Sequence, residues 1–197
     1  MGPAAAPDPL PPTPTSSPAA GEPVVIVLAS GKGERFRASG GSGSKLQALL
    51  AGKPMLEHTL DAVRASGLRW HLEDAGHPGM GDAIAAAVRA TRQAGGWLVL
   101  PGDLPLVQPV TLRAVATALS GAEVVVPVHA GQRGHPVGFS AGCGSELALL
   151  SGPRGAAGLL RARAVRELPV DDVGVLTDID TVQALADAER LWRSTQS

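Results

Sequence analysis

The 197-residue sequence is poor in cysteine, in surplus charge and in long apolar runs. Its one cysteine, Cys143, has no second thiol in the chain with which to form a disulfide, which favours a reducing compartment. Lys and Arg number 17 against 18 Asp and Glu, whereas nucleic-acid binders normally carry a basic excess that neutralises phosphates. The longest aliphatic run, residues 24–29, is far shorter than the roughly 20 apolar residues that span a bilayer. These absences argue against a disulfide scaffold, a nucleic-acid partner and a membrane protein.

Proline, by contrast, is concentrated at the start of the chain. Eight of the 17 prolines fall within the first 23 residues, together with only two charged side chains, Asp8 and Glu22. Such a stretch cannot bury enough apolar surface to offset the entropy that is lost on ordering. We therefore predict that residues 1–23 form a disordered, proline-rich arm, with docking of a partner protein as an alternative role. The arm lacks the basic start and long apolar core of a secretory signal, so we expect a cytoplasmic protein whose residues 24–197 form a single domain.

From residue 24 onward, strand-like and helix-like patterns alternate. A β-branched run at 24–29 predicts a buried strand, and further short runs predict strands at 97–100, 124–128, 137–140 and 165–168 and a brief strand at 70–72. Helical spacing of apolar residues predicts helices at 54–66, 82–94 (with Asp82 as N-cap), 111–119, 145–150, 155–163 and 181–192. This alternation is typical of an α/β fold with a mostly parallel sheet and helices on both faces. Because ligands bind at the carboxyl ends of the strands in such folds, chemistry is expected in the segments after Ala29, Leu100 and Leu176.

The first of these segments is rich in glycine and carries two cations. It reads LASGKGERF from Leu28 to Phe36 and continues through a Gly/Ser stretch to Lys45. The glycines at 31 and 33 allow the backbone to approach a ligand closely and to offer successive N–H groups to an anion. The spacing fits neither a P-loop, which needs Ser or Thr after Gly-Lys, nor the dinucleotide fingerprint, which needs a third glycine where Phe36 stands. Arg35 and Lys45 favour a triphosphate ligand, and a plain flexible connection is the alternative.

Carboxylates stand in the other two segments. Asp103 follows the predicted strand 97–100 in the sequence PGDLPLV. A carboxylate held between a glycine and a proline turn suits Mg²⁺, which in nucleotide sites binds one or two carboxylates together with substrate phosphates. Near the C-terminus, the sequence TDIDT places Asp178 and Asp180 before the last helix. We expect either Asp180 or Thr181 to cap that helix and the remaining carboxylate to complete a metal site, with turn capping as the alternative role of Asp103.

Five segments in this order resemble a known family. The segment from Leu28 to Lys45 resembles the opening signature of nucleotidyltransferases, and GDLPLV at 102–107 is similar to the metal-binding motif of that superfamily. The sequences GHPVGF at 134–139, DIDT at 178–181 and GMG at 79–81 are similar to segments of the molybdenum cofactor cytidylyltransferases, which are MobA-like NTP transferases. The resemblance implies a three-layer α/β/α, Rossmann-like fold of the nucleotide-diphosphosugar transferase type.

The resemblance also implies roles for individual residues. Arg35, Lys45 and Asp103 would be catalytic, and Asp103 would bind the metal with the help of Asp178 or Asp180. The segment at His135 and Pro136, together with Gly155, would bind the acceptor substrate, whereas a purely structural role is the alternative for His135. The nucleotide-binding residues implied in this way are Leu28, Ala29, Ser30, Gly31, Gly33, Lys45, Asp74, Gly79 and Asp103.

The implied activity is Mg²⁺-dependent transfer of CMP from CTP to the phosphate of the molybdenum cofactor (molybdopterin), with release of pyrophosphate. A molybdoenzyme or its chaperone would then be a partner protein. The glycine before Asp103 and the GHPV segment favour CTP over GTP. The alternatives are a related nucleotidyltransferase that uses GTP or a sugar-phosphate acceptor, and a nucleotide-binding relative without catalytic activity.

The sequence departs from the family pattern in four places. The loop between Arg35 and Lys45 is longer, and serines expected near Asp82 are missing. The segment 152–157 lacks the Asp and the final Arg of the family's GDxGxR motif, which motivates the sugar-phosphate alternative. Residues 67–79 leave room for one strand where the family has strand, helix and strand. We therefore expect one strand–helix unit to be missing, and this shortening motivates the non-catalytic alternative.

Overall fold

The computed structural model describes residues 21–31 and 33–195, and its centre is a seven-stranded sheet in the order β4-β1-β5-β8-β6-β7, with β9 paired to β6. Its strands are β1 (Val24–Leu28), β4 (Arg69–Glu73), β5 (Gly96–Pro101), β6 (Val124–His129), β7 (Gln132–Arg133), β8 (Val137–Ser140) and β9 (Val165–Pro169). Strands β4, β1, β5, β6 and β9 run in one direction, and β8 and β7 run in the other. The predicted, mostly parallel sheet is therefore confirmed.

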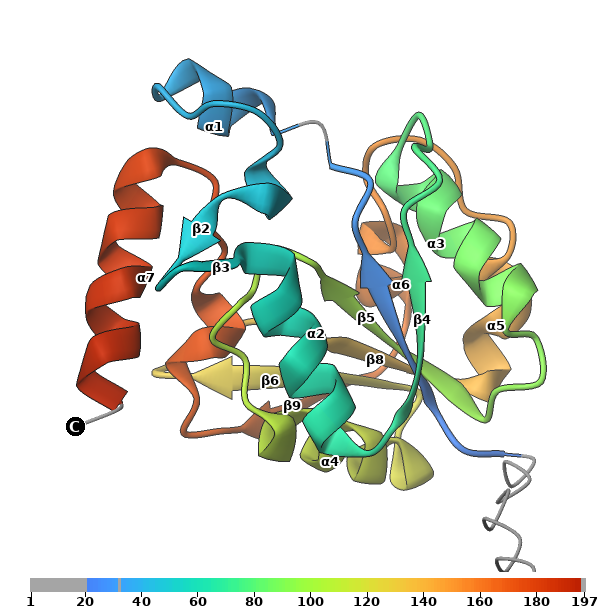
Figure 1. The fold of residues 1–197 in the computed structure, drawn as a ribbon. Coiled ribbons are helices and arrows are strands. Elements are labelled where there is room, and N and C mark those ends of the chain that lie inside the picture. The colour runs from blue at the N-terminus through green and yellow to red at the C-terminus, as the bar shows by residue number, and fades with distance from the viewer. Residues whose placement is uncertain (1–20, 32, 196–197) are drawn as a thin grey trace, which may run out of the picture.

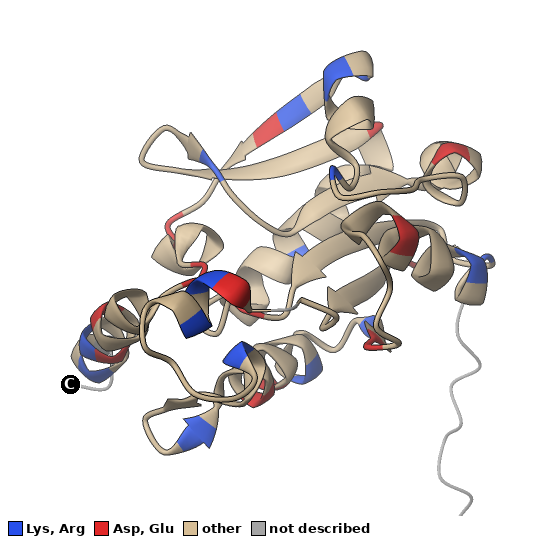
Figure 2. Ribbon diagram, turned by 90° about the horizontal axis from the view of Figure 1, so that it is seen from above, with Lys and Arg blue, Asp and Glu red and all other residues tan. Residues whose placement is uncertain are grey.

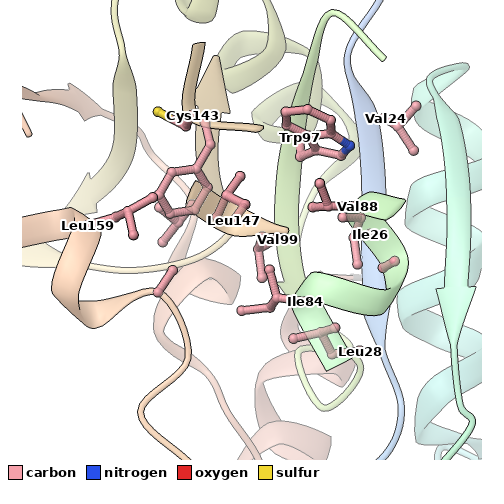
Figure 3. Close-up of a cluster of buried hydrophobic side chains, with 14 of the residues drawn as sticks. Val24, Ile26, Leu28, Ile84, Val88, Trp97, Val99, Cys143, Leu147 and Leu159 are labelled. Atoms are coloured by element: carbon pink, nitrogen blue, oxygen red, sulfur yellow. The ribbon is translucent and has the colours of Figure 1, made fainter. Parts of the chain in front are cut away.

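Helices cover both faces of this sheet (Figure 1). On one face lie α2 (Met55–Ser66) and α4 (Pro109–Ala118); on the other lie α3 (Met80–Ala90), α5 (Gly144–Leu147) and α6 (Ala157–Ala162). Successive side chains of a strand point to opposite faces. Val25 and Val27 of β1 accordingly pack in the core beneath α2 and α4, whereas Ile26 and Leu28 pack beneath α3 (Figure 3). Both faces of β1 are thus buried, which confirms the three-layer α/β/α fold.

The last helix, α7 (Val182–Thr195), lies outside these three layers. It contacts a small hairpin formed by β2 (Leu49–Leu50) and β3 (Lys53–Pro54), which lies beside it in Figure 1. A separate apolar cluster of Leu50, Met55, Ile179 and Ala188 joins these elements. Among the described residues, no helix has the length and apolar character needed to cross a membrane.

Helix α3 differs from its predicted boundaries and capping. It begins at Met80, directly after Gly79, and ends at Ala90, rather than spanning 82–94. Asp82 lies in the first turn, where its Oδ2 accepts a hydrogen bond from the backbone N–H of Gly152 at 2.9 Å. The predicted N-cap role of Asp82 is therefore wrong: its carboxylate ties α3 to the loop that follows α5.

Some elements were not predicted, and others match the sequence patterns closely. The patterns did not indicate helix α1 (Glu34–Ala38), the β2–β3 hairpin or the two-residue β7. Between α2 and α3 the chain forms the single strand β4, as expected from the shortened segment. This strand forms one edge of the sheet. Residues 1–20 of the predicted arm lie outside the described residues, while the carbonyl of Glu22 accepts a hydrogen bond from Gly95 N–H beside the start of β1.

Asp172 is a buried carboxylate that holds α4 in place. It is 2% exposed and accepts hydrogen bonds from the backbone N–H of Gln108 (2.9 Å), the hydroxyl of Thr111 (2.6 Å) and the backbone N–H of Gly174 (2.9 Å). Asp172→Ala would leave all three donors without a partner, so we expect the free energy of unfolding to fall by about 3 kcal/mol in urea denaturation. The exposed neighbour Asp171 is a matched control, and Asp171→Ala should change this free energy by less than about 0.5 kcal/mol. Equal losses in the two variants would contradict the assignment.

Candidate functional site

Two adjoining cavities lie at the carboxyl ends of β1 and β5. The larger has a volume of about 770 Å³ and the smaller of about 310 Å³. Both are lined by Gly31, Lys45, Met80, Pro101 and Asp103, so they form one continuous cleft. This is the edge of the sheet at which ligands bind in folds of this type.

The glycine-rich segment forms one wall of the cleft. It leaves β1 at Leu28, whose carbonyl accepts a hydrogen bond from Gly102 N–H, while Ala29 N–H donates to the carbonyl of Glu73. Gly33 has φ 61°, a left-handed conformation that begins α1, and a Cβ at this position would stand 3.0 Å from the Cβ of Lys45. Glycine at this position therefore permits both the turn into α1 and the close approach of Lys45.

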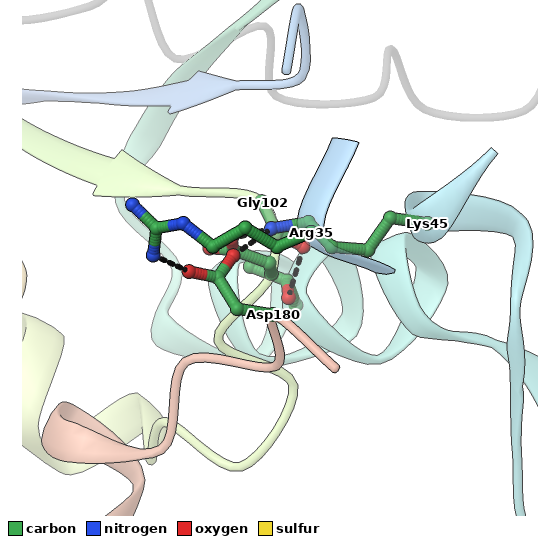
Figure 4. A network of polar contacts seen from close by, with 6 residues as sticks. Arg35, Lys45, Gly102 and Asp180 are labelled. Carbon is green, nitrogen blue, oxygen red and sulfur yellow. Dashed lines mark hydrogen bonds and ion pairs between the residues drawn. The ribbon is translucent and has the colours of Figure 1, made fainter. Parts of the chain in front are cut away.

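Two cations and two carboxylates form a connected cluster in this cleft (Figure 4). The ammonium Nζ of Lys45 lies 2.5 Å from Oδ2 of Asp103 and 2.7 Å from Oδ1 of Asp180. Nη1 of Arg35 lies 2.5 Å from Oδ2 of Asp180, and in the view from above α1 borders the segment that precedes α7 (Figure 2). The cluster thus joins residues from three parts of the chain that the sequence had singled out separately.

The electrostatics of the cluster follow from these contacts. Burial by itself would lower the pKa of Lys45, but the charges and hydrogen bonds of Asp103 and Asp180 outweigh it and raise that pKa. The hydrogen bond from Lys45, aided by the charge of Arg35, lowers the pKa of Asp180. Both shifts favour the charged forms of Lys45 and Asp180 near neutral pH.

Two hydrogen bonds to backbone carbonyls fix the position of Asp103. Its carbonyl accepts a hydrogen bond from Ile179 N–H, and the carbonyl of the preceding Gly102 accepts one from the hydroxyl of Thr59. Of its two carboxylate oxygens, Oδ2 contacts Lys45, whereas Oδ1 is buried and has no hydrogen-bond partner among the described residues. A buried anionic oxygen without a partner is costly, and it suits coordination of a cation.

The DIDT segment divides its roles among its residues. The hydroxyl of Thr181 accepts a hydrogen bond from Ala184 N–H at 3.1 Å, so Thr181 caps α7 and Asp180 is left to the cluster. Asp178 also lines the larger cavity, but it is exposed and, within the described part of the chain, makes no ion pair with Lys45 or Arg35. The pair that converges on Lys45 is therefore Asp103 and Asp180.

The first two residues of the GHPV segment, Gly134 and His135, line the larger cavity. His135 N–H donates to the carbonyl of Val175 at 2.9 Å, and the His135–Pro136 peptide bond is cis. Burial lowers the pKa of His135, although the charges of Asp103 and Asp178 oppose this effect. The imidazole therefore faces the cavity as a neutral ring at neutral pH.

Glu73, rather than Asp74, is the buried acidic residue at the end of β4. Glu73 is 7% exposed, and its Oε1 accepts hydrogen bonds from His77 at 2.9 Å and from Ala75 N–H at 3.3 Å. Its Oε2 lies 3.3 Å from Nε2 of His71, whereas Asp74 is exposed. Since His77 lines the smaller cavity, Glu73 orients a ring that faces the cleft.

The hydrogen bonds to Glu73 predict a pH dependence of stability. Burial would raise the pKa of Glu73, but the hydrogen bonds from His77, His71 and Ala75 outweigh it, so the pKa lies below its ordinary value of 4.5. The stabilisation is therefore present above pH 4.5 and is lost as the pH falls through the lowered pKa. We expect the difference in unfolding free energy between the wild type and Glu73→Gln to be largest near neutral pH and to vanish in acid. A difference that does not change with pH would contradict this role.

Most residues predicted from the sequence line the cleft, but not all. Those that line it are Leu28, Ser30, Gly31, Gly33, Arg35, Lys45, Gly79, Asp103, His135, Asp178 and Asp180. Four predicted residues do not line either cavity in the described structure, namely Ala29, Asp74, Pro136 and Gly155. Among the lining residues to which the sequence patterns assigned no role are His77, Met80, Gln132, Arg133 and Pro153. Met80 lies within the GMG segment and Pro153 within the segment 152–157, while Gln132 and Arg133 directly precede the GHPVGF segment.

This chain is similar to known proteins in both sequence and structure. The bifunctional protein GlmU of Desulfitobacterium hafniense is 32% identical over 109 residues, which cover 45% of this chain and 23% of GlmU. The chain thus spans about a quarter of the length of the curated relatives that it matches. The crystal structure of Rv0371c from Mycobacterium tuberculosis H37Rv has a TM-score of 0.74 and 25% identity, covering 87% of this chain and 98% of Rv0371c.

A third similar protein is the molybdopterin-guanine dinucleotide biosynthesis protein A of Archaeoglobus fulgidus. Its TM-score is 0.65 at 22% identity, with 87% of this chain and 99% of that chain covered, which supports the fold. The MobA-like NTP transferase domain matches residues 62–173, a segment that contains Asp103 and His135 and makes up more than half of the sequence. On this evidence, the chain belongs to the family of MobA-like NTP transferase domains.

Proposed function

We propose that this chain is a Mg²⁺-dependent enzyme that transfers CMP from CTP to the phosphate of molybdopterin and releases pyrophosphate. The observation that carries the proposal is the convergence of a glycine loop, Lys45, Arg35, Asp103 and Asp180 in one cleft. A triphosphate needs backbone N–H groups and cations, and a divalent metal needs carboxylates beside it. All of these groups line the same cavity.

The two parts of the cleft suggest where each part of the nucleotide binds. The smaller cavity is lined by Leu28, Ser30, His77 and Gly79, and we assign the base and ribose to it. The glycine loop leads from there to Lys45 and Arg35 in the larger cavity, which is where the phosphates would lie. In this assignment, the nucleotide lies along the carboxyl ends of β1 and β5, with its base in the smaller cavity and its phosphates in the larger one.

The residues present fit a divalent cation. Asp103 and Asp180 both approach one ammonium group, so their oxygens already converge on a single cation-sized point. The unpartnered Oδ1 of Asp103 offers a further oxygen. Mg²⁺ is commonly bound by one or two carboxylates plus substrate phosphates, and when bound it neutralises negative charge on those phosphates. We assign Asp103 and Asp180 to this role, with the exposed Asp178 nearby.

The reaction requires no nucleophile from the protein. An oxygen of the acceptor's terminal phosphate forms a bond to the α-phosphorus, and the bond from that phosphorus to the β-phosphate oxygen breaks. The acceptor phosphate is already anionic near neutral pH, so the barrier lies in bringing two anions together and in stabilising the leaving pyrophosphate. Lys45 and Arg35 supply positive charge where pyrophosphate leaves, and the cleft aligns the two reactants.

The acceptor is assigned to the part of the larger cavity around His135. His135 and Arg133 line this cavity and come from a segment of the chain separate from the glycine loop. The GHPVGF sequence around His135 supports a molybdopterin acceptor because it is similar to the cytidylyltransferase segment, and the same resemblance supports CTP. The altered segment at 152–157 supports a sugar phosphate as the second candidate acceptor.

Pyrophosphate release tests the proposal directly. The purified chain would be incubated with Mg²⁺ and each of CTP, GTP, ATP and UTP, in the presence of molybdopterin or of a sugar 1-phosphate. We expect pyrophosphate and a CMP–molybdopterin product from CTP, and much slower release with the other nucleotides. Turnover with the sugar phosphate but not with molybdopterin would identify a sugar phosphate as the acceptor. No turnover with any pair of nucleotide and acceptor would contradict an enzymatic role.

A further inference from the structure

The centre of the acidic pair is occupied by a positive charge that belongs to the protein itself. Nζ of Lys45 lies 2.5 Å from Asp103 and 2.7 Å from Asp180, and its side chain is only 9% exposed. These are the same two carboxylates that are proposed to bind the divalent cation. Arg35, the other cation assigned to the phosphates, also contacts Asp180. Both phosphate-binding cations are therefore paired with carboxylates in this state.

We propose that Lys45 is an internal counter-ion which competes with the divalent cation for Asp103 and Asp180. In this scheme, which rests on the proposed function, Lys45 leaves the carboxylates for the triphosphate when the divalent cation takes its place. The three donors of an ammonium group are sufficient to hold either two carboxylates or a polyphosphate. One lysine thus serves two alternative anionic partners.

The electrostatic cost of each single step makes the two exchanges depend on each other. A divalent cation that binds alone must displace Lys45 and leave a nearly buried ammonium without an anionic partner, which is unfavourable. A triphosphate that binds alone, and draws Lys45 away, leaves Asp103 without a cationic partner and Asp180 with only the exposed Arg35, beside further negative charge. When both ligands bind, the cation holds the carboxylates and Lys45 holds the phosphates, so every charge has a partner. Because such coupling is reciprocal, each ligand raises the affinity for the other by the same factor.

The experiment measures binding of Mn²⁺ by the electron paramagnetic resonance signal of the free ion, with and without CTP and in the absence of acceptor. Lys45→Met keeps the apolar stem and removes the charge. We expect this variant to bind Mn²⁺ alone at least about tenfold more tightly than the wild type, because its carboxylates have lost their competing cation. CTP should raise the affinity for Mn²⁺ strongly in the wild type and at least about tenfold less in Lys45→Met.

The matched control is Lys53, which pairs with Asp61 on the exposed surface of the β3–α2 region. Lys53→Met should bind Mn²⁺ as the wild type does. If Lys45→Met does not fold, Lys45→Gln is used in its place, because this variant keeps a hydrogen-bond donor for Asp103. In a second measurement, Mn²⁺ alone should raise the Tm of the Lys45 variant more than that of the wild type.

The outcomes separate this inference from the proposed function. If the wild type binds Mn²⁺ with CTP but the Lys45 variants bind Mn²⁺ alone no more tightly than the wild type, the exchange of Lys45 is wrong and the metal site stands. If neither the wild type nor a Lys45 variant binds Mn²⁺ under any condition, the proposed function fails and the exchange fails with it. If the Lys45 variants bind Mn²⁺ more tightly than the wild type, and a further Asp103→Asn change abolishes this binding, the result supports both the exchange of Lys45 and the proposed metal site.

Discussion

Replacing Asp103 by asparagine is expected to reduce kcat for nucleotidyl transfer by at least about 100-fold, the scale on which removal of one electrostatic group acts in enzymes. The variant keeps the shape of the side chain, and the backbone carbonyl of Asp103 can still accept its hydrogen bond from Ile179. It removes the negative charge that faces Lys45 and that is proposed to bind the metal. The measurement is the rate of pyrophosphate release from CTP at saturating Mg²⁺.

The fold should survive this change. Far-UV circular dichroism of Asp103→Asn should match the wild type, and any drop in Tm should be small compared with the loss of rate. Asp171→Asn is a suitable control because Asp171 is an exposed aspartate outside the cleft. If Asp103→Asn keeps activity within a few-fold of the wild type, the carboxylate does not hold the metal.

Lys45→Ala is expected to weaken the binding of CTP, measured by calorimetry in the presence of Mg²⁺, by about 10- to 100-fold. A charge-assisted hydrogen bond to a phosphate contributes about 1.5–3 kcal/mol, which corresponds to this range of affinity. The loss should exceed any effect on folding, because Lys45 lines the cleft and belongs to neither of the two main apolar clusters.

The control for this second variant is Lys53→Ala. Lys53 lies near Lys45 in the sequence but pairs with Asp61 at an exposed position. Its replacement should leave CTP affinity unchanged, since exposed ion pairs contribute little and Lys53 does not line either cavity of the cleft. Equal CTP binding by Lys45→Ala and the wild type would exclude Lys45 as a phosphate ligand.

Elements with a strong local pattern could be predicted from the sequence. The buried run at 24–28 forms β1, and the segment 55–66 with its helical apolar spacing forms α2. A strand that is buried on both faces has a continuous apolar run, and a helix that is buried on one face has apolar residues at helical spacing, so both can be recognised from neighbouring residues. Elements with a weak pattern were missed. Helix α1 has five residues and one buried side chain, Phe36, which is too few to give a helical period. Asp82 was misassigned because its hydrogen-bond partner, Gly152, lies far away in the chain.

The alternation of strands and helices, the glycine loop and the types of charged residue at the strand ends could be predicted from local sequence patterns, since these features depend on neighbouring residues. Tertiary structure alone decided which charges meet. Lys45 is 58 residues from Asp103 and 135 residues from Asp180, and no local pattern relates them. They meet because the parallel neighbours β1 and β5 end at the same edge of the sheet, and because the hydrogen bond from Ile179 to Asp103 draws in the segment before α7. Asp180 joined this group rather than capping the helix because Thr181 took the capping position.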